Sequence, residues 1–148
     1  MVKKYRKAVF IVVYRKTKSI FNKTKIRYLI LKRKLHWTGW EFPKGGIEKK
    51  ESILKTIQRE IQEETGQTPS NIKSYSLSGK FKYNQEIPER KEFIGQSYKL
   101  YSAELSSKKI KIDDLEHSKY KWTSYEKAMK LLTYPNQKKC LKEVNRKL

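Results

Sequence analysis

Residues Trp40 to Gly66 read WEFPKGGIEKKESILKTIQREIQEETG, and this stretch decides the fold. Between Glu51 and Thr65 there is neither Gly nor Pro, and apolar residues recur at the three- and four-residue spacing of one buried helical face. The apolar residues are Ile53, Leu54, Ile57 and Ile61. Gly66 follows the last turn, where a residue that tolerates a left-handed conformation commonly ends a helix. The pattern predicts a helix over 51–65, preceded by a loop that contains Gly45 and Gly46.

The same stretch concentrates negative charge in a strongly basic protein. It holds six of the fifteen acidic residues of a chain whose formal net charge is +21. Glu60, Glu63 and Glu64 stand at i, i+3 and i+4, so their side chains share one helix face, although like charges at this spacing repel. Three converging carboxylates suit Mg²⁺ or Mn²⁺, which prefer oxygen ligands and keep water for substrate phosphates. A solvated acidic face with an intrahelical Arg59 pair is the alternative interpretation.

The run that begins at Gly45 resembles the Nudix box, G-x5-E-x7-R-E-U-x-E-E-x-G-U, in which U is apolar. Gly45, Glu51 and the segment 59–66 match the fixed positions, and Gln67 stands where the final apolar residue is expected. The resemblance implies a single Nudix hydrolase domain over residues 1–148, folded as an α/β/α sandwich with a mixed β-sheet. It also implies a metal-dependent pyrophosphohydrolase.

The resemblance assigns roles to individual residues of the box. Glu60, Glu63 and Glu64 would bind Mg²⁺ or Mn²⁺, and Glu63, Glu64 and Arg59 would be catalytic. In the Nudix family the backbone carbonyl just before the box glycine commonly joins the metal site, and by position that residue is Lys44.

Periodicity outside the box predicts the remaining elements. Apolar or alternating runs predict strands at 8–13, 26–31, 72–83 and 93–105 and a short one that ends at Trp122, whereas the polar run 15–25 is expected to be a loop. Thr123 and Glu126 have capping-box spacing, which predicts a helix start, and a last helix follows Pro135. Strands on both sides of the box helix and two closing helices indicate a mixed sheet covered on both faces.

The second half of the chain is similar to the asymmetric diadenosine tetraphosphate hydrolases of the Nudix family. Their E-H-x-x-Y-x-W run corresponds to residues 116–122, and an aromatic before the closing helix corresponds to Tyr134. By this match Glu116 would be a further metal ligand or the catalytic base. His117 is either an acid–base residue or a loop histidine bonded to the backbone. Tyr83, seventeen residues after Gly66, resembles the tyrosine that marks this subgroup.

The expected substrate is diadenosine tetraphosphate, cut to ATP and AMP. Tyr83 and Tyr134 are hypothesised to bind one adenine between them, and Lys44, Lys80 or Lys82 to bind the phosphate chain; packing in the sheet or a helix is the alternative for each tyrosine. RNA 5′-end pyrophosphohydrolysis is the first alternative function, because the WEFPKGG run resembles such enzymes. Housecleaning of modified nucleoside triphosphates and a catalytically idle nucleotide or RNA sensor are the others.

The composition indicates the cellular compartment and the kinds of partner to expect. The single cysteine, Cys140, excludes an internal disulfide and is expected to be a packing residue, and no apolar run is long enough to cross a membrane. We therefore expect a cytoplasmic protein without a membrane partner, either a monomer or a homodimer. Of the thirty-six basic residues twenty-nine are Lys. This excess fits either a polynucleotide-binding surface or a general basicity that attracts polyphosphates.

Overall fold

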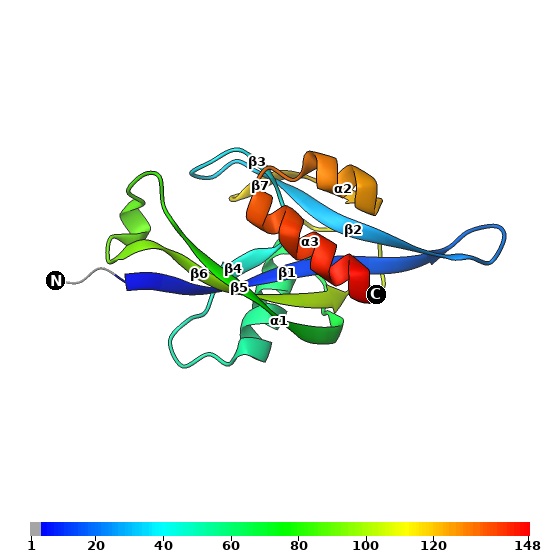
Figure 1. Ribbon diagram of the computed structural model, residues 1–148, viewed down its shortest axis with the longest axis horizontal. Helices are drawn as coiled ribbons and strands as arrows, with labels where there is room; N and C mark the ends of the chain where they lie inside the picture. Colours follow the sequence, from blue (N-terminus) through cyan, green and yellow to red (C-terminus); the bar gives the residue numbers. More distant parts are fainter. Residues whose placement is uncertain (1–3) are drawn as a thin grey trace.

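The computed structural model describes residues 4–148, and its elements are arranged around one seven-stranded sheet (Figure 1). The strands are β1 (Lys4–Lys18), β2 (Thr24–Arg33), β3 (Gly39–Glu41), β4 (Lys44–Gly46), β5 (Ser70–Lys82), β6 (Phe93–Glu104) and β7 (His117–Thr123). The helices are α1 (Ile53–Thr65), α2 (Tyr125–Leu131), α3 (Pro135–Lys147) and the short 3₁₀ helix η1 (Pro88–Arg90). The strand order is β3-β2-β1-β6-β5, with β4 paired to β1 and β7 paired to β2. β1 and β6 are parallel and the other pairs antiparallel, so the sheet is mixed.

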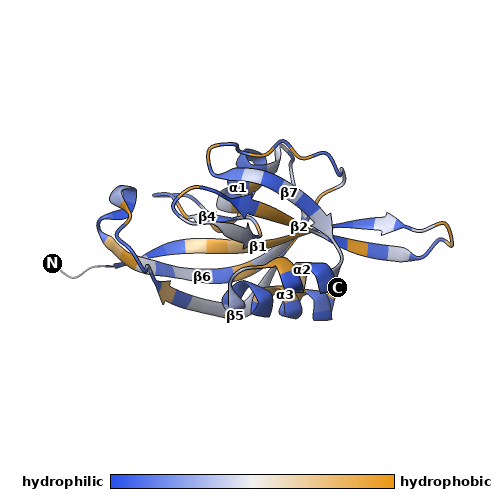
Figure 2. Ribbon diagram, turned by 90° about the horizontal axis from the view of Figure 1, so that it is seen from above, coloured by the Kyte–Doolittle hydropathy of each residue, from blue (hydrophilic) through white to orange (hydrophobic). Residues whose placement is uncertain are grey.

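The central strand β1 separates two hydrophobic clusters, because successive side chains of a strand point to opposite faces. Val9, Ile11 and Val13 pack with Ile57 and Ile61 of α1. The intervening β1 residues pack with α2 and α3 on the other face; this second cluster includes Phe10, Val12, Tyr14, Ala128, Leu141 and Val144. Figure 2 shows α1 on one side of the strands and α2 and α3 on the other. The predicted α/β/α sandwich with a mixed sheet is confirmed.

The box helix is present, but its apolar stripe is shorter than predicted. Ser52 caps α1 by accepting a hydrogen bond from the Lys55 amide, and Gly66 ends it with a φ of 77°. Ile57 and Ile61 are fully buried, whereas Ile53 and Leu54 in the first turn are exposed. The inward positions of the helix also hold polar residues, namely Thr56, Glu60 and Glu64. The inward face is therefore shared between the core and the carboxylates.

Two segments expected to be loops are strands. β1 continues to Lys18 and β2 begins at Thr24, so only residues 19–23 of the expected 15–25 loop form the turn. Gly45 and Gly46 lie in β4, which pairs with the Ala8–Phe10 part of β1. In both places the residues expected to form a loop are polar or Gly, so the strands that they form leave no hydrophobic periodicity in the sequence.

The C-terminal region follows the prediction with one shift. α2 is capped by Ser124, one residue after the expected Thr123. Cys140 is buried in α3, and this burial raises the pKa of its thiol to about 12, as suits a packing residue. Within residues 4–148 none of the helices has the length and hydropathy needed to span a bilayer.

Candidate functional site

Helix α1 directs two of its three predicted metal ligands inward and the third outward. Glu64 is 2 % exposed, and neither of its carboxylate oxygens has a hydrogen-bond partner. Glu60 is buried beside it, and its Oε1 accepts a hydrogen bond from Arg59 at 2.8 Å. The Glu63 side chain is 53 % exposed and makes only a 3.5 Å contact with Arg59. The fold thus places Glu60 and Glu64 inside the site and Glu63 at its rim.

Arg59 links the box helix to the glycine strand. Its Nη2 donates to the Gly46 carbonyl at 2.9 Å, and its Nε donates to Glu51 Oε2 at 2.7 Å. The hydrogen bond between the two side chains raises the pKa of Arg59 and lowers that of Glu51 to about 2. Gly45 lies directly against the Glu60 carboxyl group, where a Cβ would clash. Arg59 therefore positions Glu60, and the absent side chain of Gly45 makes room for it.

The two inward carboxylates are strongly destabilised as anions. Burial raises the pKa of Glu64 well above its ordinary value, and the charges of Glu60, Glu41 and Glu116 raise it further. Burial also raises the pKa of Glu60 to about 7, against the opposing charge of Arg59. A divalent cation with oxygen ligands would relieve both effects. The unpartnered oxygens of Glu64 therefore fit the predicted Mg²⁺ or Mn²⁺.

Glu116 and His117 reach the same centre from the start of β7. Ligand atoms of Glu64, Glu116 and His117 all lie within 4.8 Å of one another. Glu116 Oε2 accepts a hydrogen bond from Arg33 Nη1 at 3.2 Å. His117 is fully buried, with its Nε2 2.9 Å from Glu41 Oε2 and its Nδ1 unpartnered. The alternative of a loop histidine bonded to the backbone was wrong, because β7 pairs with β2 and turns this side chain toward a carboxylate.

Glu41 of β3 is a third buried carboxylate, which no sequence pattern singled out. Its Oε1 accepts a hydrogen bond from Trp37 Nε1 at 3.3 Å and lies 3.8 Å from Lys44 Nζ, while its Oε2 lies 3.4 Å from Arg33 Nη1. Burial alone would raise the pKa of Glu41, but Lys44, the hydrogen bond from His117 and Arg33 outweigh it and lower this pKa to about 2. The Lys44 side chain is thus held by an internal partner.

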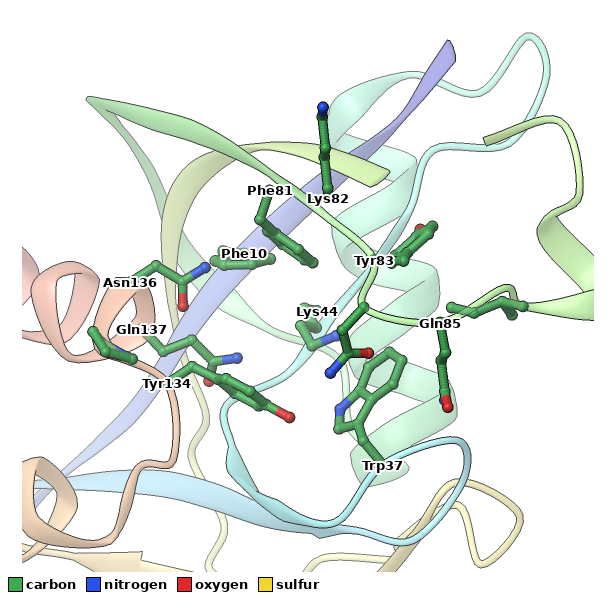
Figure 3. A pocket seen from close by; sticks show the side chains of 13 residues that line it. Phe10, Trp37, Lys44, Phe81, Lys82, Tyr83, Gln85, Tyr134, Asn136 and Gln137 are labelled. Atoms are coloured by element: carbon green, nitrogen blue, oxygen red, sulfur yellow. The ribbon is translucent and has the colours of Figure 1, made fainter. Parts of the chain in front are cut away.

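A cavity of about 370 Å³ lies next to this charged region (Figure 3). Aromatic and amide side chains dominate its wall. It is lined by Phe10, Trp37, Lys44, Phe81, Lys82, Tyr83, Asn84, Gln85, Ile87, Tyr134, Pro135, Asn136 and Gln137. Lys44 belongs both to this wall and to the Glu41 cluster, so the cavity adjoins the carboxylates.

Three aromatic residues of the wall come from separate parts of the chain. Tyr83 follows β5, and its hydroxyl lies 3.3 Å from Gln96 Oε1 and accepts a hydrogen bond from Arg90 at 3.2 Å. Tyr134 precedes α3 and faces the same cavity as Trp37 (Figure 3). The Trp37 ring lies 4.6 Å from the Arg33 guanidinium carbon and 4.8 Å from Lys44 Nζ. The fold brings both predicted tyrosines to one cavity and adds Trp37, which had no local sequence signal.

Arg6 and Arg90 form a pair of cations near the carboxylates that the sequence also did not reveal. The Arg6 guanidinium lies against Gly46. Burial and the charge of Arg90 lower the pKa of Arg6, while Tyr83, Glu60 and Glu116 oppose this shift. Within residues 4–148 neither arginine forms an ion pair with an acidic side chain. Neither guanidinium charge is neutralised by an acidic side chain among these residues, although Arg90 donates a hydrogen bond to the Tyr83 hydroxyl.

Two of the three lysines proposed to bind the phosphate chain, Lys80 and Lys82, do not direct their ammonium groups into the cavity. Lys80 alternates with Phe81 on β5, so it points away from the cavity, and its Nζ lies 4.9 Å from the Tyr5 ring centre. Lys82 lines the cavity, but its ammonium group points away from the aromatic rings (Figure 3).

Comparisons with known proteins agree with this geometry. Residues 4–144 match the family model of the NUDIX domain. An RNA pyrophosphohydrolase of Francisella tularensis is 31% identical over 99 residues, which cover 60% of this chain and 63% of the relative, so the match spans less than two thirds of that protein. A C. elegans Ap4A hydrolase is 24% identical with a TM-score of 0.70, covering 95% of this chain and 96% of that one. A Listeria monocytogenes protein described as a NUDIX hydrolase is 27% identical with a TM-score of 0.68, covering 95% and 92%.

Proposed function

The chain belongs to the Nudix family, and from that premise we propose that it hydrolyses a phosphoanhydride bond in a nucleotide with a bound divalent cation. The observation that carries the proposal is the buried Glu64 carboxylate, whose two oxygens have no partner. Burial and the neighbouring carboxylates raise the pKa of Glu64, and the charge of Lys44, which also lines the aromatic cavity, opposes this rise. A nucleotide with its base in the cavity can therefore extend its phosphates toward the carboxylates.

Glu60, Glu64 and Glu116 would hold Mg²⁺ or Mn²⁺, with Glu63 at the rim of the site. When bound, such an ion neutralises phosphate charge and lowers the pKa of a coordinated water molecule. Arg59 fixes Glu60 through a 2.8 Å hydrogen bond, and a 3.2 Å hydrogen bond from an arginine of β2 fixes Glu116. Glu63, Glu64 and Glu116 are the proposed catalytic carboxylates. Each could act as a general base that accepts a proton from the attacking water.

For the substrate we propose diadenosine tetraphosphate, cleaved to ATP and AMP. An adenine would stack among Tyr83, Tyr134 and Trp37, since all three line the cavity. Arg6 and Arg90 would bind the phosphate chain, because paired guanidinium groups without an internal acidic partner suit a polyanion. The similarity to the C. elegans Ap4A hydrolase supports this substrate.

A product assay tests the substrate. Diadenosine tetraphosphate is incubated with the protein and Mg²⁺, and the nucleotides are separated by ion-exchange chromatography. ATP and AMP in equal amounts support the proposal, whereas two ADP per substrate or no turnover contradicts it. Glu64→Gln should lower turnover on the order of 10³-fold. Glu126→Gln, which neutralises an exposed glutamate of α2, is the matched control.

A second candidate substrate is the triphosphorylated 5′ end of RNA. Two observations favour it: the 31% identity to an RNA pyrophosphohydrolase, and the charge of residues 1–40, which include thirteen basic and no acidic residues. Release of pyrophosphate from 5′-triphosphorylated RNA, at a rate that exceeds cleavage of the dinucleotide, would favour this candidate over the first. A cytoplasmic location and a monomeric or homodimeric state stay predictions.

A further inference from the structure

The outer part of the β1–β2 hairpin has no function in the proposed hydrolysis, and we propose that it binds the backbone of single-stranded RNA. We define the β1–β2 arm as residues 15–27. None of its residues lines the cavity or contributes to the carboxylate centre. The proposed binding therefore does not require a 5′ triphosphate, and it does not depend on which nucleotide the site hydrolyses.

The arm is a two-stranded ribbon that projects from the body of the protein (Figures 1 and 2). Its register runs from Arg15 opposite Arg27 to Lys18 opposite Thr24. An isolated two-stranded ribbon is at best marginally stable in water. At the base of the arm Arg15 lies over the Trp122 ring and Ile26 packs against the core. The stability of the fold does not explain why the ribbon continues beyond these contacts.

The charge of the arm is entirely positive. It contains six basic residues in thirteen positions and no acidic residue: Arg15, Lys16, Lys18, Lys23, Lys25 and Arg27. No side chain of the arm forms a salt bridge with another part of residues 4–148. Arg15 and Arg27 lie directly opposite each other, a placement that destabilises an antiparallel pair. An external polyanion would remove this repulsion.

The tip of the arm displays two apolar side chains on an ordered turn. Ile20 is 94 % exposed and Phe21 79 % exposed, the highest values among the exposed large hydrophobic residues. The Ser19 hydroxyl accepts hydrogen bonds from the amides of Phe21 and Lys23, each at 3.3 Å, and the Ser19 amide donates to the Lys23 carbonyl. Phe21 is thus held outward on a fixed backbone, where its ring can stack on an RNA base.

The distribution of charge favours RNA over an anionic membrane as the partner. Alternation along the strands places Arg15 and Lys16 on opposite faces of the ribbon, and Lys25 and Arg27 extend the charge away from the tip. A membrane surface would contact mainly the tip and its nearest lysines. A nucleic-acid strand can follow the whole ribbon, with phosphates on the basic side chains and bases on Phe21.

Binding of a 5′-hydroxyl single-stranded RNA oligonucleotide, measured by fluorescence anisotropy at several NaCl concentrations, tests the proposal. The arm variant replaces Lys16, Lys18, Lys23 and Lys25 by Gln, and the control variant replaces four exposed lysines of α2 and α3, Lys127, Lys130, Lys139 and Lys142, by Gln. We expect the arm variant to bind at least tenfold more weakly. The negative slope of log affinity against log salt concentration should become shallower by about 3, because four cations are removed. The control variant should change affinity less than threefold.

The tip and the alternative partner need separate measurements. Phe21→Ser should weaken RNA binding several-fold without changing the salt slope, because a base-stacking ring carries no charge. Equal losses in the arm and control variants, or unchanged RNA binding by the arm variant, would overturn the proposal. So would arm-dependent binding to phosphatidylserine vesicles without arm-dependent RNA binding. If Mg²⁺-dependent hydrolysis fails while the arm effect persists, only the proposed hydrolytic function is rejected.

Discussion

Glu41 and Glu64 are both buried glutamates of one site, yet their surroundings shift their pKa values in opposite directions. Glu41 is 1 % exposed and is paired with Lys44, Arg33 and His117, and its pKa is lowered to about 2. Glu64 is 2 % exposed, has no hydrogen-bond partner, and its pKa is raised. Burial is the same for both side chains, so the partners decide the difference.

The comparison indicates that Glu41 is a structural carboxylate and that Glu64 is a candidate metal ligand. The charge of Glu41 is compensated by side chains of the protein itself, namely two cations and a histidine. Lys44 compensates the charge of Glu64 only in part, because burial and the acidic Glu60, Glu41 and Glu116 raise its pKa. A cation from outside would complete the compensation. Replacing the two residues should therefore give different outcomes, one in stability and the other in activity.

The largest effect is expected for Glu64→Gln. Turnover with Mg²⁺ should fall on the order of 10³-fold, equivalent to about 4 kcal/mol of transition-state stabilisation, because a metal ligand is lost. The free energy of unfolding without metal should stay equal or rise, since the neutral amide avoids a buried charge. Steady-state kinetics and urea denaturation measure the two quantities. Normal turnover by the folded variant would contradict the assignment.

Glu41→Gln should show the reverse pattern in stability. Removing one partner of a buried charge cluster leaves Lys44 and Arg33 uncompensated, and we expect a loss of about 3–5 kcal/mol in the free energy of unfolding. The loss should be the same with and without Mg²⁺. Urea denaturation measures this loss. Glu126→Gln is the control variant and should change the free energy of unfolding by less than about 0.5 kcal/mol. An unchanged unfolding midpoint would show that Glu41 is not the structural carboxylate.

Glu41 and Glu60, the second inward carboxylate of α1, predict opposite effects of pH on the stability of the metal-free protein. The low pKa of Glu41 contributes stability above the ordinary value of 4.5, and this contribution is lost as pH falls toward 2. The raised pKa of Glu60 contributes stability at low pH that is lost as pH rises from 4.5 through about 7, by about 3 kcal/mol. Stability should peak near pH 5 without metal and shift upward with Mg²⁺. Thermal unfolding across pH 3–9 would detect this shift, and an identical profile with and without Mg²⁺ would contradict it.

The smallest effect concerns Trp37, which connects the Glu41 cluster to the cavity. Trp37→Phe removes the indole N–H that donates to Glu41 at 3.3 Å but retains an aromatic ring. We expect a loss of about 1 kcal/mol in stability. KM for the dinucleotide should rise a few-fold, with kcat nearly constant. A change confined to kcat would contradict the assignment of Trp37 to base binding.

The carboxylates of α1 could be predicted because their spacing lies within one helix and depends only on helical geometry. The contacts of Glu41 with Arg33 and His117 could not be predicted, since the pairing of β2 with β3 and β7 brings these residues together from distant positions. Residues 15–25 were expected to be a loop because the strand residues among them, 15–18 and 24–25, are polar, and backbone hydrogen bonds leave no hydrophobic pattern. Lys80 was assigned to phosphate by its charge, although strand alternation turns it away from the cavity.

The central claim is that Glu64 is uncompensated because it serves a divalent cation. Calorimetric titration of Mn²⁺ or Mg²⁺ into the metal-free protein, at pH 6 and pH 8, tests it most directly in the wild type and in Glu64→Gln. The account predicts binding by the wild type that is tighter at pH 8, because the buried carboxyl groups must release protons to the buffer, and greatly weakened binding by the variant. Equal affinity of the two proteins for the metal, at either pH, would contradict it.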